Sequence, residues 1–159
     1  MQDHGPRRAV VHDAAQRHRA ERVVRVVHIE TLPEGWLGKV HAMHSGADAS
    51  TGQWILFADA DVIFSPDIIR RAVAHAESQD LDHFSLIPKM EPAPLLLDAT
   101  VTGFVQLLVH QVYGFRAMPF GTGAFNMARR RCLEASEGLA WLKMEIADDS
   151  GLAWLITEA

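Results

Sequence analysis

The sequence predicts an α/β fold in which helices flank a mostly parallel sheet, and three observations support this prediction. Short apolar runs alternate along the chain with segments whose apolar residues recur at helical spacing. The run at 22–29 is dense in valine, as a strand buried in a parallel sheet would be. Ser65-Pro66-Asp67 combines residues that favour the start of a helix, so a helical segment is expected to separate two of the strands.

Each predicted element depends on a local pattern. Valines mark the first strand, and Pro33-Glu34-Gly35 follows it as a break, because proline and glycine interrupt regular structure. Gly52 closes the next helix, and the apolar run Trp54-Ile55-Leu56-Phe57 lies within the second strand. In order, the expected elements are a helix at 7–21, a strand at 22–29, a helix at 39–50, a strand at 53–58, a helix at 65–79, a strand at 83–87, a helix at 94–112, a strand at 124–128, and helices at 129–136 and 148–156.

Length, charge and cysteine content narrow the class of protein. A chain of 159 residues suits one domain with its own core, so residues 1–159 are expected to form a single domain. The net charge of -5 argues against a nucleic-acid partner, which would call for a basic face. The single cysteine, Cys132, excludes an intramolecular disulfide framework and a cysteine-rich zinc site. It also fits a reducing compartment, so we expect a cytoplasmic protein without a leader or anchor at residues 1–8.

Residues 95–113 form the most apolar stretch of the chain. Asp98, Gln106 and His110 lie within it, so a bilayer span is not predicted. An amphipathic helix lying in a membrane interface fits this composition better. Contact with a membrane is therefore expected to be peripheral, at its inner face.

Two aspartates follow the second predicted strand directly. In open α/β sheets ligands bind beyond the carboxyl ends of the strands, which is where Asp59 and Asp61 lie in the sequence. Two carboxylates one residue apart can approach one hard cation, Mg²⁺ or Mn²⁺, that also takes phosphate oxygens. The structural alternative is a polar loop that caps the next helix, but the position after a buried strand favours a metal-diphosphate site.

A second acidic pair, Asp148-Asp149, opens the last predicted helix. Acidic residues in a first turn complement the helix dipole, which is the purely structural interpretation. The functional interpretation is that one of them acts as a general base facing a reacting hydroxyl. The local pattern leaves both interpretations open.

Gly121-Thr122-Gly123 resembles a phosphate loop only superficially. Asn126 stands at the third glycine position of the dinucleotide fingerprint, and no clear strand precedes the glycines. The segment would either let the backbone approach a ligand closely or form a simple turn.

Four further side chains have both structural and functional interpretations. His41 and His44 would share one helix face, but a solvated or core role is favoured over zinc binding. Trp36 is the tryptophan best placed to stack on a sugar, although tryptophans are more typical of a core or a pocket wall. Cys132 has no obvious activating partner and is interpreted as structural.

Several blocks of the chain, taken in order, resemble family 2 glycosyltransferases of the GT-A fold, and they look like those of bacterial members associated with hopanoid- or carotenoid-type lipid glycosylation. The resemblance covers about residues 20–158, and the order of the blocks makes it specific. The blocks are Leu32-Pro33-Glu34-Gly35-Trp36-Leu37-Gly38-Lys39, Ala49-Ser50-Thr51-Gly52, Ile55-Leu56-Phe57-Ala58-Asp59-Ala60-Asp61, Gly121-Thr122-Gly123-Ala124-Phe125-Asn126-Met127 and Ala147-Asp148-Asp149.

This resemblance implies a nucleotide-sugar donor and a GT-A-like sheet. Asp59 would face the nucleotide and Asp61 would coordinate Mg²⁺ or Mn²⁺ on the diphosphate, with Asp59 as its neighbouring metal residue in the Asp-x-Asp motif. Lys39, Gly121 and Gly123 would line the donor site.

The resemblance also implies an inverting hexosyltransferase type of reaction. Asp149 corresponds to the catalytic base, and Asp148 corresponds to its acidic neighbour. The base would deprotonate an acceptor hydroxyl, with a membrane lipid as one expected acceptor, and the hydroxyl would displace the nucleoside diphosphate.

The chain departs from the family at its start. Family members begin with a strand that ends in a Pro-x-x-Asn-Glu type loop, followed by a second strand and an Asp-rich turn. Asp3-His4-Gly5-Pro6-Arg7 is at most a remnant of that turn. We therefore expect a partial domain whose sheet is incomplete at the N-terminus, between the counterparts of 22–29 and 53–58. An inactive relative that at most binds a partner is the corresponding alternative.

A second enzymatic alternative is a haloacid-dehalogenase-like phosphatase, because the segment 55–62 also imitates the motif of that family. Asp59 would then be a covalent nucleophile, Asp148 and Asp149 would be metal ligands, and Lys89 would lie between them in sequence. The blocks upstream of residue 53 have no place in that family, so the glycosyltransferase prediction is preferred.

Overall fold

The computed structural model describes residues 24–89, 94–114 and 119–158. The chain divides into two compact units, Met1–Thr31 and Leu32–Ala159. The helix expected at 7–21 lies outside the described residues, and the expectation of a single domain stays a prediction. Within the first unit, residues 24–31 form neither helix nor strand, so the strand predicted at 22–29 is wrong over its described part. Val24 and Val27 are 41% and 43% exposed, and these valines therefore lack the burial that stabilises a strand.

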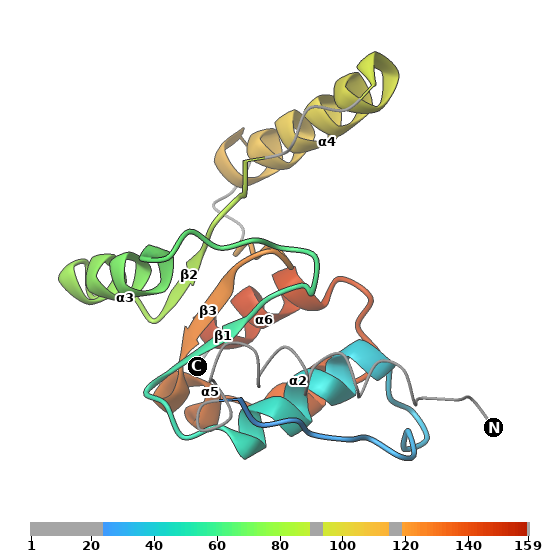
Figure 1. The fold of residues 1–159 in the computed structure, drawn as a ribbon, viewed down its shortest axis with the longest axis vertical. Coiled ribbons are helices and arrows are strands. Elements are labelled where there is room, and N and C mark those ends of the chain that lie inside the picture. Colours follow the sequence, from blue (N-terminus) through green and yellow to red (C-terminus); the bar gives the residue numbers. More distant parts are fainter. Residues whose placement is uncertain (1–23, 90–93, 115–118, 159) are drawn as a thin grey trace. The chain divides into compact units, whose positions relative to one another are not determined.

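The second unit alternates helices and strands as the sequence predicts (Figure 1). Gly35 has a positive φ of 76° in the turn before the first helix, which explains a glycine there. The elements are α2 (Gly38–Ala49), β1 (Trp54–Phe57), α3 (Ile68–Ser78), β2 (His83–Ser85), α4 (Leu95–Gly114), β3 (Asn126–Arg129), α5 (Arg130–Ala135), the 3₁₀ helix η1 (Leu139–Leu142) and α6 (Asp148–Thr157). Each expected element after residue 38 is confirmed within a few residues, and η1 was not predicted.

The three described strands form one sheet in the order β1-β3-β2, and both of its pairings are antiparallel. The expected mostly parallel sheet is therefore not what these strands form. The helical connection through α3 does leave β1 and β2 pointing the same way, as a βαβ alternation predicts. The two strands are not neighbours, however, because β3 lies between them and runs in the opposite direction. Met127 of β3 is opposite Leu56 on one side and Phe84 on the other.

Two helix ends differ from the predicted signals. Helix α3 begins at Ile68, and Ser65 acts through its backbone carbonyl, which accepts a hydrogen bond from the Ile68 N–H at 3.1 Å. Ser65 is therefore not the N-cap, and Pro66 precedes the helix. Helix α2 ends at Ala49, before Gly52, and the Ser50 hydroxyl donates to the carbonyl of Ala47 at 2.7 Å.

The sheet is covered on both faces, because alternate residues of each strand point to opposite sides. Ile55 and Ala128 pack on one face with residues of α2, α5, η1 and α6. Leu56 and Met127 pack on the other face with residues of α3. The face toward α2 and α6 is the one that positions the candidate site.

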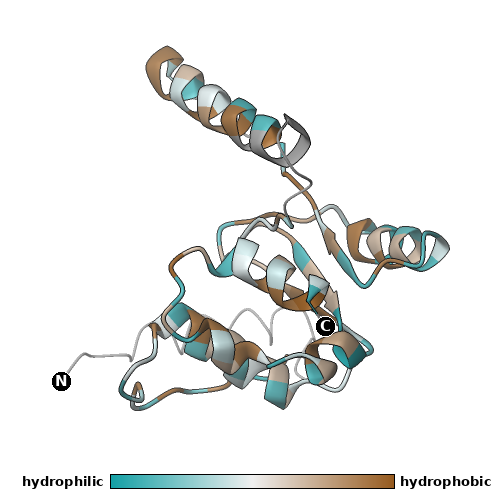
Figure 2. Ribbon diagram, turned by 180° about the vertical axis from the view of Figure 1, so that it is seen from behind, coloured by the Kyte–Doolittle hydropathy of each residue, from teal (hydrophilic) through white to brown (hydrophobic). Residues whose placement is uncertain are grey.

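Helix α4 carries several large apolar residues that are exposed. Leu95, Leu96 and Leu97 are 86%, 83% and 54% exposed, and Phe104 and Leu107 are more than half exposed. Figure 2 shows apolar residues along most of the helix. Since successive residues of a helix point about 100° apart, three consecutive exposed leucines give α4 a wide apolar surface.

In the part of the chain that the structure describes, no helix has both the length and the apolar character needed to cross a membrane.

Candidate active site

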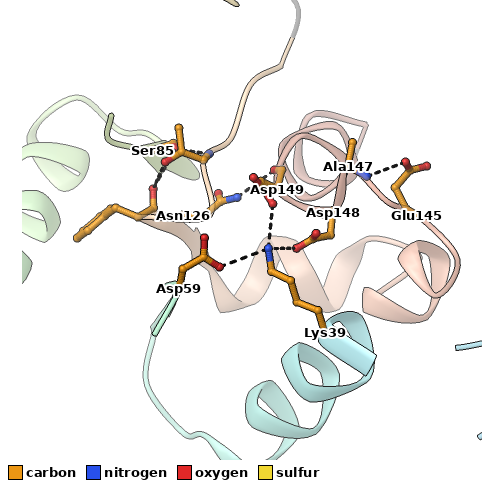
Figure 3. A network of polar contacts seen from close by, with 10 residues as sticks. Lys39, Asp59, Ser85, Asn126, Glu145, Ala147, Asp148 and Asp149 are labelled. Atoms are coloured by element: carbon orange, nitrogen blue, oxygen red, sulfur yellow. Dashed lines mark hydrogen bonds and ion pairs between the residues drawn. The ribbon is translucent and has the colours of Figure 1, made fainter. Parts of the chain in front are cut away.

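One lysine joins three aspartates from two other segments of the chain, as Figure 3 shows. The Nζ of Lys39 lies 2.9 Å from Asp148 Oδ2, 3.2 Å from Asp149 Oδ1 and 3.5 Å from Asp59 Oδ1. Lys39 is the second residue of α2, and the Asp148-Asp149 pair begins α6. Asp59 follows β1 by two residues. Four of the residues expected in the site are thus brought together.

Helix electrostatics explain part of this arrangement. The N-terminus of a helix carries partial positive charge, so Asp148 and Asp149 are well placed in the first turn of α6. A cation in the first turn of α2 is unfavourable by the same reasoning, yet Lys39 stands there. Its three carboxylate partners offset this cost. The position of Lys39 is therefore explained by the site and not by the helix that carries it.

The charges of the cluster also alter its pKa values. Burial alone would lower the pKa of Lys39, but its hydrogen bond to Asp148 and the charges of Asp149 and Asp148 raise it above the ordinary value. The pKa of Asp148 is raised, because burial and the nearby charge of Asp149 outweigh the opposing effect of Lys39. Asp148 is only 6% exposed, which explains why burial raises its pKa. Lys39 therefore stays protonated and tied to the acidic pair at neutral pH.

The two glycines of the 121–123 loop are explained by close approach to these aspartates. A Cβ on Gly123 would collide with the carboxylate of Asp59, and one on Gly121 would collide with the backbone carbonyl of Asp149. The Asp59 N–H also donates to the carbonyl of Gly123 at 2.7 Å. Thr122 anchors the loop to the end of β2, since its N–H donates to the Ser85 hydroxyl at 2.9 Å. The loop therefore packs directly against the acidic residues.

Asn126 is a residue of the site that sequence reasoning missed. It begins β3, is 2% exposed, and lies on the sheet face toward α6. Its Nδ2 donates to the backbone carbonyl of Asp149 at 2.9 Å, and its Oδ1 lies 2.6 Å from Nε2 of His83. Because Nδ2 donates, Oδ1 is the acceptor and His83 is the donor. A polar residue inside the strand predicted at 124–128 was the signal in the sequence that could have identified Asn126.

These residues line one cavity of about 560 Å³ between α2, the end of β1 and the start of α6. Its polar lining includes Lys39, Asp59, Asn126, Asp148 and Asp149, and its apolar wall comes from α2 and β1. A cavity of this size accommodates a small ligand with a charged group.

Gly121, expected in the donor site, and Asp61, expected to bind the metal, lie outside the lining of the first cavity. Gly121 lines a second, adjoining cavity and not the first. Asp61 lies in the turn after Asp59, is exposed, and is absent from the described residues that line the first cavity.

Trp36 and Cys132 both pack against the hydrophobic core. The ring of Trp36 meets those of His41 and His44 edge-on, each at 5.2 Å between centroids, and Trp36 packs against the core. Cys132 packs against the same core, and burial raises the pKa of its thiol. Both findings agree with the structural interpretations.

The carboxylates of the site are chemically suited to a metal ion, because carboxylate oxygens are the ligands that Mg²⁺ and Mn²⁺ prefer. In the described residues no group of three or more His, Cys, Asp and Glu side chains is arranged to hold a metal ion. The Lys39 ammonium instead lies among the oxygens of Asp59, Asp148 and Asp149. The carboxylates thus already surround one cationic group.

Comparison with known protein families gives a match. The family described as Glycosyl transferase family 2 matches residues 9–149. Since the match covers most of the chain, the protein belongs to glycosyl transferase family 2. Comparisons with curated proteins and with solved structures gave no significant match. Membership of this family favours a sugar transferase over the phosphatase alternative.

Proposed function

We propose that the chain transfers a sugar from a nucleotide-sugar donor to an acceptor hydroxyl with inversion, within a GT-A-like fold. The observation that supports this most directly is the junction of Lys39 with Asp59, Asp148 and Asp149 at one cavity, in a chain that belongs to glycosyl transferase family 2. Such a reaction needs a base beside a site for a diphosphate leaving group, and the cavity offers a carboxylate base beside a cation.

In the proposed reaction Asp149 is the base. Its carboxylate accepts the proton of the acceptor hydroxyl while the oxygen forms a bond to the anomeric carbon. The bond from that carbon to the diphosphate breaks, and its electron pair leaves with the nucleoside diphosphate. Lys39 would hold Asp149 in place before the reaction, and Asn126 would fix the backbone from which Asp149 projects.

The donor would occupy the first cavity, with the diphosphate near Lys39, Asp59 and Gly123. Asp59 and Asp61 would hold a divalent cation, Mg²⁺ or Mn²⁺, whose charge would neutralise the leaving group. The resemblance of the Asp59-Ala60-Asp61 motif to that of family 2 glycosyltransferases supports the assignment of these two aspartates to the metal. The structure adds that Asp59 and Gly123 are in direct backbone contact, so the motif and the loop form one surface.

A membrane lipid is the acceptor that we propose, with the protein bound peripherally at the inner face of the membrane. The exposed leucines of α4 support this, because an exposed apolar patch is typical of a surface that contacts a membrane or another protein. The resemblance to the hopanoid- and carotenoid-type members supports the same class of acceptor. The cytoplasmic location stays a prediction.

The donor site can be tested by calorimetry with nucleoside diphosphates, in the presence and absence of Mn²⁺. We expect binding that strengthens with Mn²⁺ and that falls in the Asp59→Asn variant. Asp67→Asn is the matched control, because the Asp67 side chain has the same 46% exposure but lies outside the cavity. If neither uridine nor guanosine diphosphate binds, or if the two variants behave alike, the proposed function is wrong.

A further inference from the structure

A second cavity of about 400 Å³ adjoins the first and differs from it in chemistry. Its walls include Ile87, Phe104, Val105 and Phe120, together with alanines and the glycines of the 121–123 loop. Asp149 is the one charged residue among the described residues that line it. The cavity therefore presents an apolar space with a single carboxylate.

The two cavities meet at the candidate base. Asp149 and Gly123 line both of them, whereas Lys39, Asp59 and Asp148 line only the first. A group-transfer enzyme has to bring two substrates to one base from different sides. The charged cavity suits a nucleotide sugar, which leaves the apolar cavity on the other side of Asp149 for the second substrate.

The polar groups of the second cavity limit what that substrate can be. The hydroxyl of Thr122 is occupied, because it donates to the carbonyl of Leu86 at 2.7 Å. Ser150 is the other hydroxyl in the lining. A sugar acceptor carries several hydroxyls, and burying them against apolar walls without partners is unfavourable. A molecule with one hydroxyl on an apolar body leaves no such group unpaired.

We infer that the second cavity is the acceptor site and that it takes a lipid alcohol, with its hydroxyl at Asp149 and its apolar body against Phe104, Ile87 and Phe120. This inference rests on the proposed function and adds the place and the chemistry of its second substrate. The acceptor proton passes to a carboxylate oxygen of Asp149 as the glycosidic bond forms, and the nucleoside diphosphate leaves with the electron pair of the broken bond.

Phe104 gives this cavity a connection to the exterior. It belongs to the lining and is also 59% exposed. The leucines at the start of α4 are exposed as well. Phe104 therefore belongs both to the lining of the second cavity and to the exposed apolar residues of α4.

Two charged variants test the inference on the whole chain. Phe104→Glu introduces a charge into the lining, and Leu107→Glu introduces the same charge at a residue of α4 that is 58% exposed and lies outside the lining. With 1-decanol as the probe and calorimetry as the measurement, we expect saturable binding that Phe104→Glu weakens by about tenfold and Leu107→Glu leaves unchanged. Ile87→Asp, on another wall, is expected to act like Phe104→Glu, and circular dichroism checks the folding of each variant.

The results also separate this inference from the proposed function. Methyl glucoside is the polar probe, and binding of this sugar in place of decanol would overturn the inference. Equal loss of decanol binding in Phe104→Glu and Leu107→Glu would overturn it as well. Binding of a nucleoside diphosphate with Mn²⁺ is measured on the same samples. If that binding persists while decanol does not bind, the acceptor assignment fails and the proposed function stands.

Discussion

The Nζ of Lys39 donates a hydrogen bond to Oδ1 of Asp149 at 3.2 Å, although 110 residues separate the two in the sequence. This contact joins the start of α2 to the start of α6. A single cation thus holds the candidate base next to the carboxylate that follows β1.

Replacing Lys39 by methionine removes the cation from among three carboxylates. The free energy of unfolding is expected to fall by about 1 kcal/mol, since the lysine is half exposed and the carboxylates then repel one another. Because the pKa of Lys39 is raised, its stabilising effect is complete below the ordinary lysine pKa of about 10.4 and is lost only at higher pH. Denaturant unfolding at pH 7 measures the change. Lys89→Met is the control, and an equal loss in both variants would contradict the prediction.

Replacing Asp149 by asparagine keeps the size of the side chain and removes its basicity. Sugar transfer is expected to fall by about 10² to 10⁴, while binding of the nucleoside diphosphate changes little. Asp148→Asn is expected to lose much less activity, because Asp148 is the buried partner of Lys39. Steady-state transfer rates and calorimetry distinguish the two variants, and a larger loss for Asp148→Asn would reverse the assignment of the base.

Replacing Gly123 by alanine pushes a methyl group into the carboxylate of Asp59. The carboxylate has to move, so affinity for a nucleoside diphosphate is expected to fall. The free energy of unfolding is expected to drop by about 1 kcal/mol, the lower end of the cost of overpacking, because the Asp59 carboxylate is half exposed and can turn away. Gly103→Ala is the control, because a Cβ at Gly103 meets nothing within 4 Å and alanine favours the helix α4. Unchanged affinity in Gly123→Ala would mean that the loop does not control Asp59.

His83 makes stability depend on pH. Burial lowers its pKa, although the hydrogen bond to Asn126 opposes the change. The stabilisation is therefore present above the unfolded-state pKa of about 6.5 and is lost as pH falls through the lower folded-state pKa, with a slope of at most about 1.4 kcal/mol per pH unit. His83→Gln keeps a donor for Asn126 and should flatten that slope.

His110, an exposed histidine of α4, provides the matched control for this measurement. Unfolding of the His110→Gln variant between pH 4.5 and 7.5 should follow the parent protein. If His110→Gln flattens the slope as much as His83→Gln, burial of His83 is not its cause.

The exposed leucines of α4 give a prediction for membrane binding. Replacing Leu96 and Leu97 by aspartate should abolish sedimentation with vesicles of phosphatidylcholine and phosphatidylglycerol. Ile63→Asp is the control, because Ile63 is 97% exposed on a different segment. Sedimentation that survives the double substitution in α4, or that Ile63→Asp also removes, would place the contact elsewhere.

The sequence predicted the order of the elements after residue 38 because apolar periodicity is a local property of the chain. It could not predict the sheet correctly, since the position of β3 between β1 and β2 depends on contacts between residues remote in sequence, such as Met127 with Leu56 and with Phe84. The valine-rich run at 22–29 was misleading for a related reason. Valine favours a strand only where a partner strand and a core are available, and residues 24–31 have no strand pairing in the structure.

The site was predicted in part. Asp59, Asp148 and Asp149 were identified from their motifs, but a motif carries no distance, so the role of Lys39 as their common partner emerges only from the geometry. Asn126 was missed because its function depends on the backbone of Asp149, which is remote in sequence. Conversely, Asp61 was selected by its motif, and its exposed position in the turn leaves its metal role a prediction.

The central position of β3 has a consequence for synthesis of the chain. Among the described strands, β1 and β2 each pair only with β3, which begins at Asn126. Until that segment leaves the ribosome, both earlier strands expose unpaired edges, which are prone to aggregate. The partners of Lys39 on α6 emerge shortly afterwards. The sheet and the acidic cluster can therefore assemble only after both β3 and α6 have been synthesised.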